Sequence, residues 1–187
     1  MDKIIIDIET SNSFADVGGD QNLKDLNASF VGVYSYNQDK YLSFFEKDFK
    51  EFGELLKKTG LIIGFAINRF DIPVMEKYFD FNIRKIENLD ILDEIERVLG
   101  KRIGLGVLAE ANLGAKKTGH GLQAIDMYKE GRMEDLKNYC LNDVKLTKDL
   151  YELIKKQKYL MIPNKITSEK KKMEIDFREV EMPITLF

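Results

Sequence analysis

The chain has 187 residues, a length that suits one domain with a sizeable core. Hydrophobic residues make up 44% and charged residues 33%, a composition that excludes a largely disordered chain. The formal net charge of −3 counts mildly against a nucleic-acid binder, although phosphate attraction depends on local basic patches rather than on the total.

Apolar runs in the first part of the chain predict strands. Residues 3–8 form a nearly continuous isoleucine run, which is typical of a buried strand. Residues 11–27 are polar, contain two adjacent glycines, and predict a loop. Residues 29–36 and 41–45 flank a short turn and predict an antiparallel hairpin.

Helices and strands then alternate. Residues 49–58 place apolar side chains at helical spacing, and residues 61–65 form an apolar run that predicts a strand buried on both faces. A helix over residues 72–79 follows, with its proline tolerated in the first turn, and then a short strand over residues 85–90.

The remainder is predicted to be helical, with glycines at the breaks. We expect helices over residues 91–99, 105–111, 122–128 and 133–157. The last helix is the longest, and its inner stripe consists of Leu136, Cys140, Val144, Thr147, Leu150, Tyr151 and Ile154.

This order predicts an α/β fold. Three antiparallel strands followed by parallel crossovers indicate a mixed sheet of about five strands flanked by helices. We assign residues 1–160 to this domain and residues 161–187 to a C-terminal extension. The extension begins basic, with lysines at 170–172, and residues 173–180 alternate like a strand. It could add an edge strand, pair with a partner or a second copy, or stay mobile.

The sequence predicts neither a membrane span nor a secretion signal. No apolar run approaches the roughly 20 residues that cross a bilayer. The run that follows Met1 is too short for a signal peptide, and Asp7 interrupts it. Cys140 is the only cysteine, so no internal disulfide is possible and a cytoplasmic location is expected.

Asp7 and Glu9 lie at the end of the first predicted strand. Residues i and i+2 of a strand point to one face, so the two carboxylates repel each other unless a cation binds between them. Alternatively, the strand ends there and both side chains are solvated.

Two further carboxylates stand where ligand groups are often found. Asp71 follows the apolar strand, at the start of the next helix, where it could bind a ligand or simply cap that helix. Tyr139 and Asp143 are spaced i and i+4, so they share one helical face. That pair suits a bound metal ion whose attacking water is oriented by the phenol, or else it belongs to a half-exposed helix.

Together, Asp7-x-Glu9, Phe70-Asp71-x-Pro73 and Tyr139-x-x-x-Asp143 resemble, in this order, the DEDD exonuclease superfamily. This is the proofreading branch of the ribonuclease H-like fold, and the tyrosine is typical of its Tyr subclass. The surrounding residues are most similar to bacterial exonuclease-like domains related to family B DNA polymerase exonucleases. The resemblance covers roughly residues 3–155 and implies that residues 1–160 form the exonuclease domain.

The resemblance implies metal-dependent 3′→5′ exonuclease activity on a single-stranded 3′ end of DNA or RNA. Two Mg²⁺ or Mn²⁺ ions, roughly 4 Å apart, would be held by oxygen ligands. Asp7 would bridge both ions, Glu9 and Asp143 would complete the site of the attacking water, and Asp71 would support the second ion. Tyr139 would aim that water as a neutral phenol.

Substrate contacts are expected from several further residues. Relatives commonly carry Asn two residues after the glycine that corresponds to Gly64, but here Ala66 stands there and Asn68 or Arg69 would substitute. We also expect contacts from three basic side chains in a glycine-rich segment and from one hydroxyl: Lys116, Lys117, His120 and Thr10. Phe14 is expected to pack into the core, with stacking on a base as the alternative.

Two other functions remain open from the sequence. A ribonuclease H-like endonuclease or resolvase would share the fold and the metals but cut internally. A catalytically inactive nucleic-acid-binding module would keep the fold alone. The intact acidic positions favour an enzyme, whereas Ala66 leaves room for the inactive module.

Overall fold

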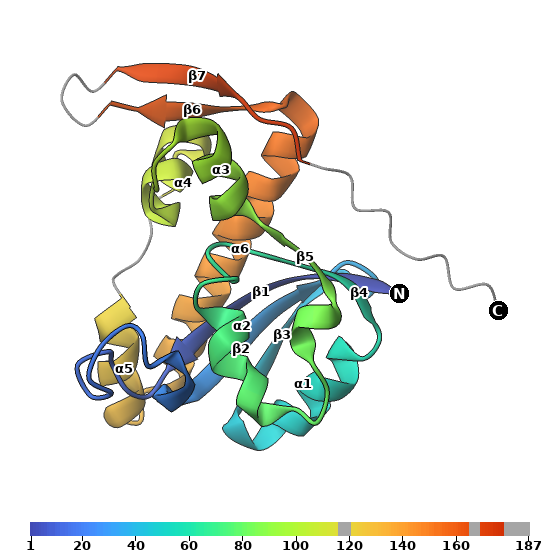
Figure 1. Cartoon of the computed structure of the whole chain (residues 1–187), viewed down its shortest axis with the longest axis vertical. Coiled ribbons are helices and arrows are strands. Elements are labelled where there is room, and N and C mark those ends of the chain that lie inside the picture. Colours follow the sequence, from blue (N-terminus) through green and yellow to red (C-terminus); the bar gives the residue numbers. More distant parts are fainter. Residues whose placement is uncertain (116–120, 165–168, 178–187) are drawn as a thin grey trace.

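The computed structural model describes residues 1–115, 121–164 and 169–177. A five-stranded sheet with the order β3-β2-β1-β4-β5 forms its centre (Figure 1). The β1–β2 and β2–β3 pairs are antiparallel, whereas the β1–β4 and β4–β5 pairs are parallel. The predicted mixed sheet is therefore confirmed. Its strands are β1 (Asp2–Thr10), β2 (Ala28–Ser35), β3 (Lys40–Phe45), β4 (Thr59–Gly64) and β5 (Glu87–Asp90).

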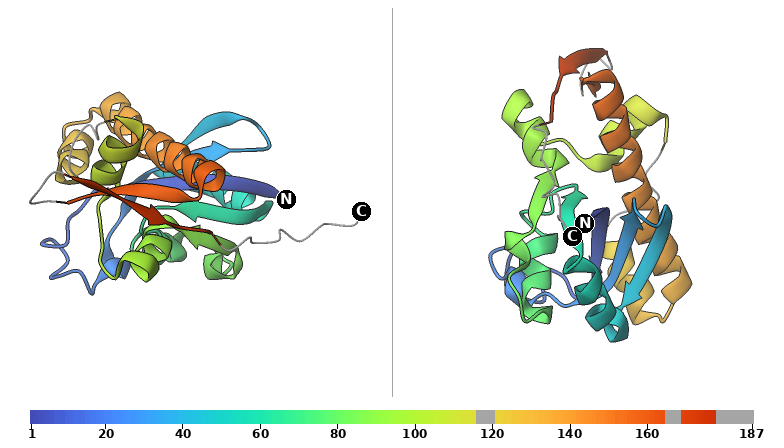
Figure 2. Two further views of the ribbon diagram at one scale, coloured as in Figure 1. Left: turned by 90° about the horizontal axis from the view of Figure 1, so that it is seen from above. Right: turned by 90° about the vertical axis from the view of Figure 1, so that its right-hand side faces the viewer.

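Helices cover both faces of the sheet (Figures 1 and 2). One face packs on α1 (Phe49–Leu56) and α2 (Asp71–Met75), and the other packs on α3 (Ile91–Leu99), α4 (Leu105–Leu113) and α6 (Met133–Gln157). The remaining helix, α5 (Gly121–Lys129), lies against α6. Every predicted helix is present. The second is shorter than expected, because the chain continues from α2 as a 3₁₀ turn, Glu76–Tyr78.

The central strand β1 changes character along one face. Ile4, Ile6 and Ile8 belong to the core under α1 and α2. Ile5 belongs to the opposite core, under α6. Because side chains alternate along a strand, the next two positions on this second face are Asp7 and Glu9. The face that packs on α6 therefore turns from apolar to acidic within β1.

Gly32 on β2 explains why α6 lies so close to this acidic stretch. It pairs with Asp7 across the antiparallel ladder. A Cβ at Gly32 would lie 3.0 Å from both the Cys140 Sγ and the Val144 Cγ2 of α6. The missing side chain leaves the space into which α6 packs, and this brings Cys140 against β1.

The chain after α6 forms a hairpin of β6 (Tyr159–Pro163) and β7 (Lys170–Glu174) (Figure 1). β6 was not expected. β7 begins before the strand predicted over residues 173–180 and shares residues 173 and 174 with it, while residues 178–180 lie outside the described part of the chain. The register explains the shift: Glu174 pairs with Tyr159, the first residue of β6, so the partner strand ends there. None of the helices in the described part of the chain is long and apolar enough to cross a membrane.

Candidate active site

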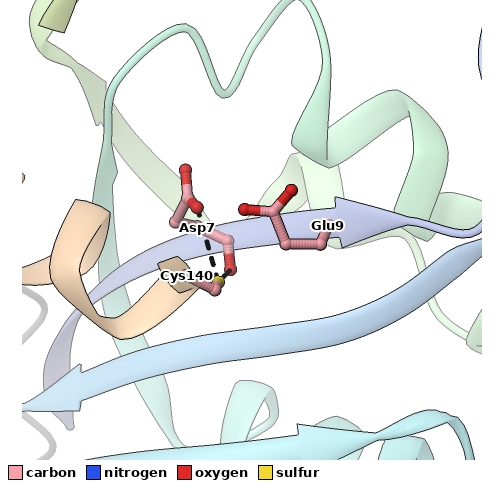
Figure 3. A group of neighbouring side chains, drawn as sticks. All are labelled: Asp7, Glu9 and Cys140. Carbon is pink, nitrogen blue, oxygen red and sulfur yellow. Dashed lines mark hydrogen bonds between the residues drawn. The ribbon is translucent and has the colours of Figure 1, made fainter. Parts of the chain in front are cut away.

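Asp7 and Glu9 project from β1 towards α6, as their spacing predicts (Figure 3). Asp7 is half-buried, and Glu9 is only 7% exposed. One ligand atom each from Asp7, Glu9 and Cys140 lies within 4.8 Å of the others. The alternative of two solvated side chains at a strand end is therefore wrong for this pair.

Asp71 joins them from the segment after β4. Its Oδ1 accepts a hydrogen bond from the backbone N–H of Ile8, at 3.1 Å, between the two acidic positions of β1. Asp71 is the first residue of α2 and Phe70 occupies the N-cap, so the alternative that Asp71 caps this helix is also wrong. Burial, and then the nearby charge of Asp7, raise the pKa of Asp71 well above its usual range. This carboxylate is held inside the protein next to another one.

Tyr139 and Asp143 complete the group from α6. Their side chains are 4% and 2% exposed, so the alternative of a half-exposed helix is wrong. All seven residues of the predicted inner stripe are buried as well. The side chains of Tyr139 and Asp143 lie one helical turn apart on α6. They therefore face the sheet, on the side that carries Asp7.

These residues share one cavity of about 570 Å³. Three separate segments supply its acidic side chains and its phenol: β1, the start of α2, and α6. The carboxylates and the phenol are Asp7, Glu9, Asp71, Asp143 and Tyr139. The cavity also has an apolar wall, formed by Phe14, Leu26, Phe65, Phe70, Leu122 and Ile125.

The residues expected to touch substrate divide into three groups. Thr10 lines the cavity, and its hydroxyl donates to the Asn12 carbonyl at 2.8 Å. The Asn68 and Arg69 side chains bind α3 instead, where both contact Asp93. Neither is among the cavity-lining residues, and their contact with substrate stays a prediction. The other three, Lys116, Lys117 and His120, lie outside the described residues.

Phe14 does not pack into the core as expected. Its ring is 42% exposed and lies edge-on to the Phe70 ring, with the centroids 5.9 Å apart. It forms part of the cavity wall because the loop after β1 folds back beside the site. Sequence reasoning also missed Leu122 and Ile125 of α5, whose helical spacing alone does not show which cavity they border.

The contact between Cys140 and Asp7 was not predicted from the sequence, which placed Cys140 only in the inner stripe of the last helix. Its Sγ donates to the Asp7 carbonyl oxygen at 3.3 Å and to the Asp7 Oδ2 at 3.4 Å (Figure 3). Burial, and then the charge of Asp7, raise the pKa of the thiol well above its usual range. In the metal-free protein Cys140 is therefore a protonated hydrogen-bond donor to Asp7.

The donor set fits a hard divalent cation. Four carboxylates converge on one cavity, and a buried carboxylate such as Asp71 next to the charge of Asp7 is unfavourable without a compensating positive charge. Oxygen ligands favour Mg²⁺ or Mn²⁺, whereas zinc sites usually draw on His or thiolate ligands.

The Asp71 carboxylate should lower the stability of the metal-free protein at neutral pH. Because its pKa is raised on folding, the protonated form stabilises the fold below its usual pKa of 3.8, and this contribution is lost as the pH rises through the folded-state value. We expect Asp71→Asn to raise the melting temperature of the metal-free protein at pH 7 by about 2–4 °C, or about 1 kcal/mol. The difference should vanish at acidic pH, and a lower melting temperature at pH 7 would contradict this account.

The five-stranded mixed sheet with helices on both faces is an RNase H-like fold. A family model described as the RNase H superfamily matches residues 4–155. The chain therefore belongs to the RNase H superfamily. No curated protein matches this sequence.

Solved structures show the same fold. The family B DNA polymerase of the hyperthermophilic archaeon Pyrobaculum calidifontis superposes with a TM-score of 0.64 at 17% identity, covering 82% of this chain and 24% of the polymerase. Exonuclease I superposes with a TM-score of 0.58 at 14% identity, covering 83% of this chain and 41% of that protein. The resemblance predicted from the motifs is confirmed at the level of family and fold.

Proposed function

We propose that this protein is a metal-dependent 3′→5′ exonuclease that hydrolyses the terminal phosphodiester of a nucleic acid with two divalent ions. The observation that carries the proposal is the convergence of four carboxylates and one phenol, from three separate segments, on a single cavity. Membership of the RNase H superfamily and the exonuclease I neighbour support a nuclease-type hydrolase as the class of enzyme.

Each acidic side chain and the phenol of the candidate site would have its own role in the reaction. Asp7 would hold both Mg²⁺ or Mn²⁺ ions, with Glu9 and Asp143 on the first and Asp71 on the second. When bound, such ions polarise the phosphoryl group, lower the pKa of water and neutralise developing charge. The Tyr139 hydroxyl would orient the attacking water. The water oxygen would form a new bond to phosphorus and lose a proton to solvent, while the P–O3′ bond breaks and O3′ takes up a proton, which releases a 5′-nucleotide and leaves a new 3′-hydroxyl.

The apolar wall of the cavity favours a single-stranded end. Among the described residues that line the cavity none is Lys or Arg and several are aromatic or aliphatic, so contacts with the bases would contribute to binding. Aromatic side chains stack on unpaired bases without reading their sequence. The exposed ring of Phe14, beside Phe70, is suited to this contact.

Phe14→Ala should therefore weaken substrate binding more than turnover. Stacking on one base contributes about 1–3 kcal/mol, so we expect KM for single-stranded DNA to rise roughly 5- to 150-fold with little change in kcat. Steady-state kinetics on an oligonucleotide with a labelled 3′ end measure both constants. Phe81→Ala is a suitable control, because Phe81 is a partly buried aromatic that packs in the core under α1 and α2, away from the cavity. An unchanged KM for Phe14→Ala would remove Phe14 from the substrate site.

One assay separates the proposal from its alternatives. Linear single-stranded and double-stranded DNA and RNA, labelled at the 3′ or the 5′ end, and circular single-stranded DNA are incubated with Mg²⁺, with Mn²⁺ or with a chelator. We expect mononucleotides to be released first from the 3′ end of linear strands, only with metal. Cleavage of the circle would indicate an endonuclease or resolvase. Binding without degradation would indicate an inactive module.

The remaining expectations are part of the same proposal. Residues 1–160 would act as the exonuclease domain in the cytoplasm, and residues 161–187 would serve as an extension that contacts a partner or a second copy. The described part of that extension is not separate from the domain core. Ile162, Ile175 and Phe177 pack in the same apolar cluster as Ile5 of β1.

A further inference from the structure

The turn between β4 and α2, residues 65–70, has an unusual backbone. Ala66 has a φ of +69°, in the left-handed region that is strained for residues with a side chain. The turn is braced inside by the N–H groups of Arg69 and Phe70, which donate to the Ala66 carbonyl at 3.1 and 3.2 Å. Such a conformation persists only where the surroundings hold it.

Asp90, the last residue of β5, supplies those surroundings. It is 3% exposed and lies opposite Gly64 in the parallel ladder. Its Oδ1 accepts from the Ala66 N–H at 2.8 Å, and its Oδ2 accepts from the Asn68 N–H at 3.0 Å. One buried carboxylate therefore binds the backbone of the turn at both of its oxygens.

The same carboxylate also caps α3. Its Oδ1 accepts from the N–H groups of Leu92 and Asp93, at 3.0 and 3.4 Å. Asp90 thus ties the turn to the start of a helix that packs in the core. The four N–H donors offset the desolvation of the carboxylate, which explains how the charge is accommodated there.

The turn in question forms part of the candidate active site. Phe65, Ala66 and Phe70 line the cavity, and the chain continues directly into Asp71. The Asp71 carboxylate reaches the Ile8 N–H of β1 at 3.1 Å, so its position depends on where the turn ends. A shift of the turn would move Asp71 relative to Asp7.

We infer that Asp90 is a positioning residue of the metal site: it clamps the strained turn at Ala66 and Asn68 so that Asp71 and the apolar wall face the carboxylates of β1. The inference rests on the proposed function, because it assigns Asp71 to a divalent-metal site. Asp90 does not line the cavity; it acts through the turn, and its charge also contributes to the raised pKa of Asp71.

Asp90→Asn tests the clamp. The amide keeps one acceptor oxygen, so the N–H of either Ala66 or Asn68 loses its partner. Asp93→Asn is the matched control, because it makes the same change three residues later, where the described contacts are to the side chains of Asn68 and Arg69. Both variants remove one negative charge from the same region.

Two readouts are independent of catalysis. In the metal-free protein, hydrogen exchange at the Ala66 and Asn68 amides should be at least about tenfold faster in Asp90→Asn than in the control. Calorimetric titration with Mn²⁺ should show an affinity roughly 10- to 100-fold weaker, as is usual when a partner behind a metal ligand is lost. Asp93→Asn should change either quantity by less than about threefold.

Two further variants make the test decisive. Asp90→Ser retains an acceptor for the start of α3 but is too short to span to the turn, so it should reproduce the Mn²⁺ defect even if Asp90→Asn fails to fold. Adding Ala66→Gly to either variant removes the left-handed cost and should restore part of the Mn²⁺ affinity. If Asp90→Asn or Asp90→Ser matches the control in both readouts, the clamp is refuted.

The outcome can be separated from that of the proposed function. If the wild-type protein binds Mn²⁺ and the Asp90 variants bind it weakly, the clamp stands whether or not any nucleic acid is degraded. If nuclease activity is present and the Asp90 variants match the control in exchange, Mn²⁺ affinity, KM and kcat, the exonuclease proposal stands and the clamp falls.

Discussion

Asp7→Asn should lower the rate of nucleotide release by at least about 10³-fold. Asp7 interacts with several side chains of the candidate site. It lies near Glu9, accepts a hydrogen bond from the Cys140 thiol and raises the pKa of Asp71. Losing the charge stabilisation that it would provide through bound metal removes several kcal/mol, and each 1.36 kcal/mol is tenfold in rate. Initial rates with saturating single-stranded DNA and Mg²⁺ measure the loss.

Asp2→Asn on the same strand is the matched control for Asp7→Asn. Asp2 is 5% exposed and binds the Ser35 hydroxyl and the Asn37 N–H at the opposite end of β1. This control should lower stability while leaving kcat within about twofold. Asp7→Asn should fold at least as well as the wild type, because it relieves repulsion with Asp71. Full activity in Asp7→Asn would place the chemistry elsewhere.

Gly64→Ala should destabilise the protein by about 2–3 kcal/mol, with a fall in melting temperature of roughly 5–10 °C. An added Cβ would lie 2.1 Å from the Ile67 Cγ2 and 3.2 Å from the Ile6 carbonyl oxygen. Ile67 is β-branched and fully buried, so its methyl has no free space to enter. Thermal and urea unfolding measure the loss of stability.

Two further variants identify the contact responsible. Gly104→Ala introduces the same methyl group where no atom lies within 4 Å, and it should change stability by less than about 0.5 kcal/mol. In the background of Ile67→Ala, the substitution Gly64→Ala should cost much less than in the wild type, because the clashing methyl is gone. Additive effects would show that Ile67 is not the obstacle.

Much of the fold was predictable because periodicity reports burial directly. The isoleucine run of β1 and the inner stripe of α6 predicted a buried strand and a long helix, and both are present. The hairpin after α6 was less accessible. Lys158 ends the helix with a φ of +59°, a conformation usually marked by glycine, so no stop signal precedes β6. The lysines of β7 are strand residues only because β6 pairs with them.

The sequence predicted which acidic residues form the candidate site, but it did not predict how buried they are. The order of the acidic motifs indicated Asp7, Glu9, Asp71 and Asp143, all of which line one cavity. The sequence did not indicate that these carboxylates are buried, because the local sequence pattern around a carboxylate is the same whether its side chain is solvated or enclosed. Phe14 shows the reverse error, since an aromatic residue in a loop has no periodicity to show which way it points.

The sequence by itself determined the order of strands and helices and the residue types of the site, because alternation and helical spacing are local properties of the chain. Only the tertiary structure decided which groups meet. The absent side chain of Gly32 on β2 lets Cys140 of α6 approach Asp7 of β1. Asp90 binds the backbone of a turn that precedes it by more than 20 residues. Such contacts depend on packing between distant segments, for which a single sequence carries no local signal.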